Sequence, residues 1–306
     1  MSSRRGEPID GVLLLDKDTG MSSNAALQAA RRLLGARKAG HTGTLDPLAS
    51  GLLPLCFGEA TKFSARWLDA DKEYRAELRL GATTTTGDAE GEVVAESPVN
   101  CSAADVHAAA VPLRGEIEQL PPMYSALKHQ GRPLYEYARA GREIAREPRR
   151  VTIHELEIEA VEGAFVRMRV RCSKGTYVRT LAEALGGALG CGAHLTALRR
   201  LAIGPFGLER ALTLAQLEPG DLQARRAHLL PADLLVADFP RIDLDQDVAR
   251  RIALGQRVPL ADCALAGSLR LYWQDRFMGL GQYADGVLEP LRLVAQAESG
   301  APAVNA

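Results

Sequence analysis

The chain has 306 residues, of which 46% are apolar and 25% charged; this is the composition of an ordinary globular protein and argues against disorder. A formal net charge of −1 argues against coating of nucleic acid by bulk charge, although a local basic face is compatible with it. No apolar run approaches a membrane span or a signal-peptide core. We therefore expect a cytoplasmic protein with one large domain, or with a large and a small one.

The cysteines are odd in number, scattered and never in a CxxC pair: Cys56, Cys101, Cys172, Cys191 and Cys263. This pattern indicates neither a disulfide framework nor a zinc site, and the six histidines have no metal-site spacing either. We expect reduced, buried cysteines and no bound metal.

The first predicted elements are a strand and a helix. Residues 11–16, GVLLLD, are a continuous apolar run typical of a buried strand. The following helix has Ser22 or Ser23 as its N-cap and Gly35 as its stop, with apolar positions spaced along one face. Residues 58–70 predict a second short helix.

Between these helices lies the stretch AGHTGTLDPLASG, residues 39–51, with three glycines, a proline, a histidine and a single carboxylate, Asp46. These residues form turns, and a structural turn is the simpler interpretation. A residue before proline is held near extended geometry, and nearby glycines let a ligand approach closely. The loop is therefore also suited to present Asp46 as a nucleophile, and the pattern leaves both interpretations open.

Residues 72–80, KEYRAELRL, alternate between apolar and charged side chains and predict a half-buried strand. Its inner face carries, in order, Tyr74, Ala76, Leu78 and Leu80. A polar turn at residues 83–91 leads to a strand around Val93 and Val94. A capped helix begins at Ser102.

Residues 123–150 are basic, with seven lysines and arginines against three glutamates, and tyrosines are interleaved among them. Pro133 and Gly141 are typical start and stop signals of a short helix. One interpretation is a solvated charged excursion. The other is an RNA-facing segment that combines phosphate contacts with base stacking.

Strands resume at residues 151–163 and 164–172. In the second strand Arg167, Arg169 and Arg171 share one face, which is either solvent-exposed or a phosphate track. An amphipathic helix within residues 173–190 has Tyr177 and Arg179 in its first turns. After a looser connection at residues 208–239, a helix-like segment and short strands predict a small β-rich terminal domain.

Several carboxylate and phosphate chemistries lack their motif. A phosphatase-type aspartyl nucleophile has a second Asp two residues later, where this chain has Leu48, and no partner acid of a glycosidase is identifiable. Neither a P-loop nor a dinucleotide-binding GxGxxG is present. The residues alone thus predict an RNA-contacting α+β protein with a candidate carboxylate site.

Seven blocks occur in the order found in TruB-type tRNA pseudouridine synthases: GVLLLDKDTGMSSN, AGHTGTLDPLASGLLPLCFGEATKF, DKEYRAELRLG, PPMYSALK, RPLYEYARAG, CSKGTYVRTLAEALG and CGAHLTALRRLAIGPF. The chain resembles this family over roughly residues 9–210. The resemblance implies an α+β pseudouridine synthase fold, in which helices flank a mixed, mainly antiparallel central sheet. It also implies a catalytic domain at residues 1–238 with an RNA-gripping insertion at 123–150, followed by a PUA-like RNA-binding domain at residues 239–306.

The same resemblance implies that the T-loop uridine at tRNA position 55 becomes pseudouridine. The glycosidic N–C bond breaks, the base turns, and it is rejoined through carbon without a metal or organic cofactor. The enzyme would act on the T-arm of tRNA as a monomer, with no membrane and no protein partner. Two rivals stay open, a guide-RNA-dependent relative within a complex and an RNA-binding helper without chemistry. The insertion favours the stand-alone type, because guide-dependent relatives have a much shorter element there.

The family's nucleophile falls on Asp46, and Arg179 would pair with it, keep it ionised and lower its pKa. Tyr74 would stack on the flipped base and assist proton transfer, and His41 would fill the space that the base leaves. The other implied contacts are Tyr177 and Leu198 to the uridine, Lys17 and Lys62 to phosphate or loop groups, and Lys128, Arg132, Arg139, Arg142 and Arg146 to RNA. The competing interpretations are an exposed helix arginine at Arg179, a core tyrosine at Tyr74, a turn-capping His41, core packing of Leu198 and plain surface charge at the two lysines.

Overall fold

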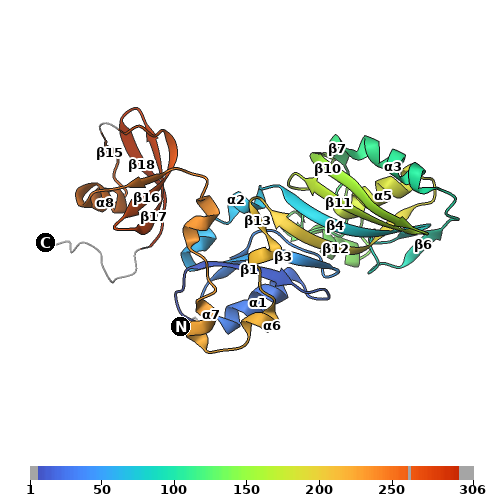
Figure 1. The fold of residues 1–306 in the computed structure, drawn as a ribbon, viewed down its shortest axis with the longest axis horizontal. Coiled ribbons are helices and arrows are strands. Elements are labelled where there is room, and N and C mark those ends of the chain that lie inside the picture. Colours follow the sequence, from blue (N-terminus) through green and yellow to red (C-terminus); the bar gives the residue numbers. More distant parts are fainter. Residues whose placement is uncertain (1–5, 261–262, 296–306) are drawn as a thin grey trace.

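The computed structural model describes residues 6–260 and 263–295, and its largest element is a sheet of nine strands (Figure 1). Seven of them follow the order β1-β3-β12-β4-β11-β10-β7, while β2 pairs with β3 and β13 with β12. The strands are β1 (Gly11–Lys17), β2 (Ala39–His41), β3 (Ala49–Phe57), β4 (Lys72–Leu80), β7 (Gly115–Gln119), β10 (Arg149–Glu162), β11 (Phe165–Cys172), β12 (Ala193–Ile203) and β13 (Phe206–Gly207). All neighbours are antiparallel except β3 and β12, which confirms the mixed, mainly antiparallel sheet.

Helices cover both faces of this sheet. The helices are α1 (Ser23–Leu33), α2 (Ala65–Leu68), α3 (Ala103–Ala110), α4 (Leu134–Arg139), α5 (Val178–Ala188), α6 (Leu214–Leu217), α7 (Leu222–Arg226) and α8 (Gln246–Ala253), with 3₁₀ turns η1 (Gly58–Lys62), η2 (Val111–Leu113), η3 (Leu208–Arg210) and η4 (Ala232–Val236). Leu27 of α1, Val106 of α3 and Leu181 of α5 share one buried cluster with the sheet. Trp67 of α2 and Leu235 of η4 belong to a second cluster, which includes residues of β1 and β3.

The predicted β-rich terminal domain is a separate sheet with the order β14-β16-β17-β18-β15. Its elements are β14 (Arg241–Asp243), α8, β15 (Val258–Pro259), β16 (Gly267–Trp273), β17 (Arg276–Ala284) and β18 (Val287–Leu293). Figure 1 shows it at the opposite end of the molecule from α3. It contacts the large domain at η1, where the Phe63 and Phe277 rings lie 5.5 Å apart. Of the predicted domains, residues 1–5, 261–262 and 296–306 lie outside the described residues.

The local signals for helix ends are confirmed. Ser22 caps α1 by accepting a hydrogen bond from the Ala25 amide, and Gly35 has a φ of +64° just beyond the helix. Ser102 and Asp105 form a reciprocal capping box at the start of α3. The short α4 begins directly after Pro133.

Four expectations about local structure need correction. The 39–51 stretch is not a loop throughout, because its ends belong to β2 and β3 and only residues 42–48 connect them. The strand β3 was not expected; it is buried on both faces, so its sequence lacks the alternation that marks a half-buried strand. Residues 58–70 form two short turns, η1 and α2, rather than one helix, and residues 208–239 contain η3, α6, α7 and η4.

The five cysteines are all free, but Cys101 and Cys263 are only half-buried, against the expectation that all are buried. Within residues 6–260 and 263–295 no helix is long and apolar enough to cross a membrane.

The insertion at residues 123–150 grows from the edge of the large sheet. The chain leaves the sheet at the end of β7 and returns at the start of β10, and Gln119 and Arg149 face each other as a cross-strand pair. Two short hairpins lie outside the main sheets, β5 (Ala82–Thr84) with β6 (Val93–Glu96), and β8 (Lys128–His129) with β9 (Arg132–Pro133), the second within the insertion.

Candidate active site

The loop of Asp46 connects β2 to β3 and is held in place by Ser23, the first residue of helix α1. The Ser23 hydroxyl accepts a hydrogen bond from the Leu45 amide at 2.7 Å and donates one to the Leu45 carbonyl oxygen at 2.9 Å. Gly51 follows with a φ of +102°, and a Cβ atom there would lie 2.2 Å from the Arg200 carbonyl oxygen. The backbone on both sides of Asp46 is therefore tightly positioned.

Arg200 on β12 supports the same loop and was not expected from the sequence. Its side chain is buried and donates to the carbonyl oxygens of Leu52 at 2.7 Å, Gly43 at 3.2 Å and Thr44 at 3.4 Å. The signal was present in the Arg199–Arg200 pair, because successive side chains of a strand point to opposite faces. Arg199 bonds Asp16 on one face, so Arg200 lies on the other.

Arg179 and Asp46 meet as the resemblance implied, with 3.0 Å between Nη2 and Oδ2. Arg179 is buried in the first turn of α5, and its guanidinium also donates to the carbonyl oxygens of Thr86 at 2.9 Å and Tyr124 at 2.6 Å. A second carboxylate, Asp88, lies 3.4 Å from Nη1. One guanidinium thus joins the Asp46 loop, the turn after β5 and the root of the insertion.

Asp88 is the main acidic residue that sequence reasoning missed. It lies in the stretch that was read as a plain polar turn, yet it is buried and accepts a 2.5 Å hydrogen bond from the Thr86 hydroxyl. A charged residue in a glycine- and threonine-rich turn gives no sign of burial by itself. Only the fold brings it to Arg179.

Burial raises the pKa of Asp46 above its ordinary value of 3.8. The Arg179 charge opposes this rise, while the nearby Asp88 charge adds to it. Arg179 thus lowers the Asp46 pKa as expected, but the loss of hydration in the concave site outweighs the ion pair, so the net shift is upward. The Asp46 side chain still keeps 40% exposure, so it faces an open space.

Two cavities open beside this carboxylate. The inner one, of about 370 Å³, is lined by Tyr74, Tyr177 and Leu198, and the outer one, of about 570 Å³, by His41, Tyr135 and Arg139. Both volumes are typical of small-ligand sites. Both cavities are lined by the same six residues where they meet: Thr44, Leu45, Asp46, Ser125, Ala126 and Arg179.

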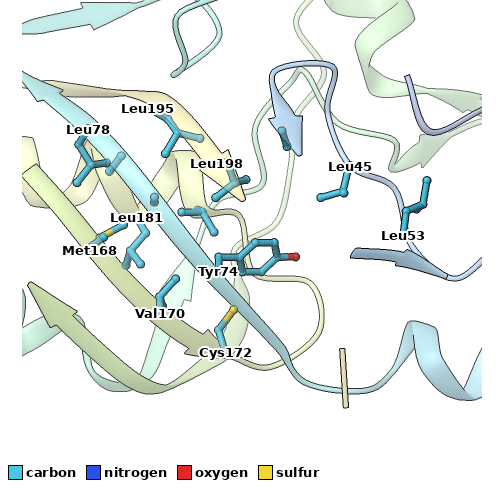
Figure 2. Packing of buried hydrophobic residues seen from close by; sticks show 14 of the residues in the cluster. Leu45, Leu53, Tyr74, Leu78, Met168, Val170, Cys172, Leu181, Leu195 and Leu198 are labelled. Atoms are coloured by element: carbon cyan, nitrogen blue, oxygen red, sulfur yellow. The ribbon is translucent and has the colours of Figure 1, made fainter. Parts of the chain in front are cut away.

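Tyr74 belongs to both the core and the inner cavity. Its position on the inner face of β4 is confirmed, and Figure 2 shows its ring extending from the apolar cluster toward Leu45, with the hydroxyl at the far end. Burial raises the pKa of its phenol. Leu198 on the neighbouring strand β12 packs into the same core cluster while lining the cavity, so its core packing and its cavity position coexist.

Tyr177, directly before α5, is held by its backbone. Gln119 accepts from the Tyr177 amide at 2.9 Å and donates to the Tyr177 carbonyl oxygen at 3.3 Å. Since Gln119 is the last residue of β7, this pair ties the edge of the sheet to the helix that carries Arg179. Gln119 is a further residue that sequence reasoning missed.

We expect Gln119→Glu to lower kcat about tenfold, because a carboxylate keeps the acceptor for the Tyr177 amide but faces its carbonyl oxygen with a second acceptor. Gln119→Met, of similar size, loses both bonds and serves as the matched comparison. Turnover and substrate affinity are measured separately, which distinguishes an effect on the reaction from an effect on binding. Unchanged kcat in both variants would contradict a positioning role for Gln119.

Of the remaining predicted contacts, His41 lines a cavity, whereas Lys17 and Lys62 line neither. His41 is half-buried at the outer cavity, and burial lowers the pKa of its imidazole. Lys17 is fully buried and donates to the Asp18 and Met21 carbonyl oxygens, so it is a loop contact and not a surface charge. Lys62 is not brought to either cavity; its ammonium bonds the Leu293 carbonyl oxygen of the terminal domain at 2.8 Å.

The basic residues of the insertion also differ in placement. Lys128 and Arg139 line the outer cavity, and Arg139 lies 5.4 Å over the Tyr135 ring. Neither Arg132 nor Arg142 lines either cavity; Arg132 is exposed, and Arg142 lies over the Tyr137 ring. Arg146 is turned inward, since it donates to the Pro121 carbonyl oxygen at 3.0 Å and pairs with Glu143.

The three arginines of β11 each pair with a glutamate: Arg167 with Glu77, Arg169 with Glu73 and Arg171 with Glu155. This pairing favours a solvent-exposed face over a phosphate track. Among the described residues, no cluster of three or more histidine, cysteine, aspartate or glutamate side chains is arranged to hold a metal ion.

Comparison with protein families and solved structures agrees with this geometry. Residues 31–178 match the N-terminal domain of the TruB family pseudouridylate synthases, residues 179–237 a tRNA pseudouridylate synthase B C-terminal domain, and residues 240–294 the C-terminal domain of pseudouridine synthase II TruB. A tRNA pseudouridine synthase B of Azoarcus sp. is 59% identical over 94% of this chain and 95% of its own length. The corresponding protein of Thiobacillus denitrificans is 58% identical, over 96% and 98%.

Two solved structures share the fold at lower identity. A chain of a Cbf5-Nop10-Gar1 complex has a TM-score of 0.66 at 28% identity, covering 89% of this chain and 78% of its own. A chain of an archaeal box H/ACA sRNP Nop10-Cbf5 complex has a TM-score of 0.67 at 25% identity, over 93% and 86%. With both fold and sequence matched along most of its length, the chain belongs to the TruB family of pseudouridylate synthases.

Proposed function

We propose that this protein converts the uridine at position 55 in the T-loop of tRNA to pseudouridine, with Asp46 as its nucleophile. The relatives named tRNA pseudouridine synthase B support the substrate. The main support for the mechanism is that the Asp46–Arg179 ion pair lies at the junction of the two cavities.

The two cavities divide a flipped nucleotide between them. The inner cavity has the aromatic and apolar lining that suits a pyrimidine ring, with Tyr74 available for stacking and for assisting proton transfer. The outer cavity has Lys128 and Arg139, which suit the sugar–phosphate chain. The glycosidic bond then crosses the junction beside Asp46, within reach of attack at either the sugar carbon or the base ring.

The reaction is an isomerisation, so it needs no net oxidant or reductant and no cofactor is proposed. Asp46 bonds to the nucleoside and the N1–C1′ bond breaks; the base turns within the inner cavity, a C5–C1′ bond forms and the bond to Asp46 is broken. The C5 carbon loses its proton and N1 gains one, so the product is an isomer of the substrate. Extrusion of the base costs a few kcal/mol, which is less for a base in an already structured loop. His41, at the outer cavity, would occupy the space that the base leaves.

RNA recognition belongs to the outer side of the site. Structured RNA is recognised by shape and by backbone contacts more than by base edges, which fits a basic insertion beside the outer cavity. We propose that the insertion grips the T-arm and that the terminal domain, residues 239–306, is a PUA-like unit that adds contacts to the same RNA. A tRNA substrate supports a cytoplasmic location, and we further propose that the enzyme acts there as a monomer without a protein partner.

The direct test is mass mapping of pseudouridine in an unmodified T-arm hairpin incubated with the purified chain alone. Pseudouridine at the position-55 equivalent is the expected result. A chain that needs a guide RNA or protein partners would leave the hairpin unmodified, and an RNA-binding helper would bind it without forming product. Sedimentation of the purified protein checks the monomer.

We expect the double substitution Lys128→Ala and Arg139→Ala to weaken hairpin binding and to flatten its salt dependence. If each side chain neutralises one phosphate, the slope of log K against log salt falls by about 0.7 to 0.9 per contact. Turnover at saturating RNA should change much less. Arg146→Ala is the comparison. The Arg146 side chain already contacts Pro121 and Glu143 of the protein, so its removal should leave the slope unchanged. An unaltered slope in the double variant would remove these side chains from the RNA face.

A further inference from the structure

Ser125, in the insertion, has a buried hydroxyl without a protein partner. Its residue is 4% exposed, and its Oγ makes no hydrogen bond to any described group. Burial raises the pKa of the nearby Tyr177 phenol and its approach to Ser125 opposes the rise, but this approach does not reach the distance and angles of a hydrogen bond. Buried polar groups almost always have a partner, so this hydroxyl needs an explanation.

The backbone around Ser125 is held rigidly. Its amide donates to the Met123 carbonyl oxygen at 2.9 Å, and its own carbonyl oxygen accepts from the Tyr135 amide at 3.1 Å. The preceding carbonyl, that of Tyr124, accepts from Arg179 at 2.6 Å. The unpaired hydroxyl is therefore presented from a fixed backbone, one residue from the group that binds the catalytic arginine.

Its location is the junction of the two cavities. Ser125 lines both of them, together with Asp46 and Arg179. A base in the inner cavity and a sugar in the outer one place the glycosidic bond at this junction. Two polar groups flank that bond in uridine, the O2 carbonyl oxygen of the base and the 2′-hydroxyl of the ribose.

We infer that Ser125 Oγ hydrogen-bonds one of the two polar groups that flank the glycosidic bond of the target uridine. Ser125 is thereby a substrate-binding residue, and the inference rests on the proposed function. A hydroxyl donates to a carbonyl oxygen and both donates to and accepts from another hydroxyl, so it suits either group. The contact holds the nucleoside from the insertion, while Asp46 comes from the connection between β2 and β3 and Arg179 from α5.

The experiment uses Ser125→Ala with T-arm hairpins that carry uridine, 2′-deoxyuridine or 2-thiouridine at the target position. Affinity and single-turnover rate are measured for each. On uridine we expect the single-turnover rate constant divided by the dissociation constant to fall about tenfold, the typical effect of one lost hydrogen bond. Ser125→Thr, which keeps a hydroxyl, should recover part of it.

The modified nucleosides identify the group. If the 2′-hydroxyl is the partner, Ser125→Ala loses nothing further on the 2′-deoxy hairpin; if O2 is the partner, it loses nothing further on the 2-thio hairpin. Thr180→Val is the matched control, since Thr180 also has a buried, unpaired hydroxyl but lines neither cavity. It should match wild type on all three hairpins.

If the wild type is active and Ser125→Ala has the same rate and affinity on the uridine hairpin, this inference is overturned while the proposed function stands. An equal loss on all three hairpins would overturn it as well, because the contact would then lie elsewhere. A wild-type chain that forms no pseudouridine would overturn the proposed function and this inference together. Thermal unfolding of Ser125→Ala, expected at or above the wild-type temperature, separates loss of contact from loss of fold.

Discussion

Asp46→Asn should abolish pseudouridine formation while leaving the T-arm hairpin bound. The amide has nearly the same shape as the carboxylate but is no nucleophile, so we expect kcat to fall by on the order of 10⁴-fold or more. Binding should stay within a fewfold of wild type, since the cavities and the insertion are untouched. Mass mapping of the product and a filter-binding titration measure the two quantities.

The fold of this variant needs its own control. The Asp46 loop is held by Ser23 and Arg200 through backbone groups, which the substitution leaves in place. Circular dichroism and the unfolding temperature should therefore match wild type. Residual turnover within about tenfold of wild type in a folded variant would show that Asp46 is not the nucleophile.

Arg179→Met should be the next most damaging change, with a loss in kcat of about 10²- to 10³-fold, the size typical of one removed electrostatic contact in an active site. It leaves Asp46 and Asp88 without their common cation and breaks the bond to the Tyr124 carbonyl oxygen. Arg179→Lys keeps the charge but lacks the planar guanidinium that reaches all four partners, so it should recover only part of the rate. Single-turnover rates at saturating hairpin check both.

The pH dependence gives this prediction a sign. The proposed role of Asp46 requires its ionised form, so its raised pKa should put the acid limb of kcat/KM above the pH expected for an ordinary aspartate. Loss of the Arg179 charge disfavours the ionised form further, so the limb should move to higher pH in Arg179→Met and less in Arg179→Lys. Asp88→Asn removes a like charge and should move it to lower pH. A limb that stays in place in all three variants would contradict the electrostatic coupling.

The sequence predicted best what is encoded locally. Alternation in residues 72–80 placed Tyr74 on the inner face of β4, and capping residues placed the starts of α1 and α3. The strand β3 was not predicted, because burial on both faces removes the alternation of apolar and polar residues. Its Pro54 also argues against a central strand.

The site was predictable only where a motif carried it. The resemblance assigned Asp46 and Arg179, which the structure brings within 3.0 Å. Asp88, Gln119 and Arg200 were missed because each acts through contacts between segments far apart in the chain. The lowering effect of Arg179 on the Asp46 pKa was predicted, but the net rise was not, since hydration of a carboxylate depends on everything that surrounds it.

The exit and return of the insertion at one cross-strand pair, Gln119 and Arg149, has a consequence for how such enzymes evolve. Any excursion that begins and ends on adjacent partners is closed by the sheet itself, so its length is free to change without disturbing strand order. The outer part of this segment, with β8, β9 and α4, can then be lengthened or trimmed, while its root must stay in place because Tyr124 there binds Arg179. Within one excursion the architecture thus combines a tip that is free to vary with a base that is fixed by the site.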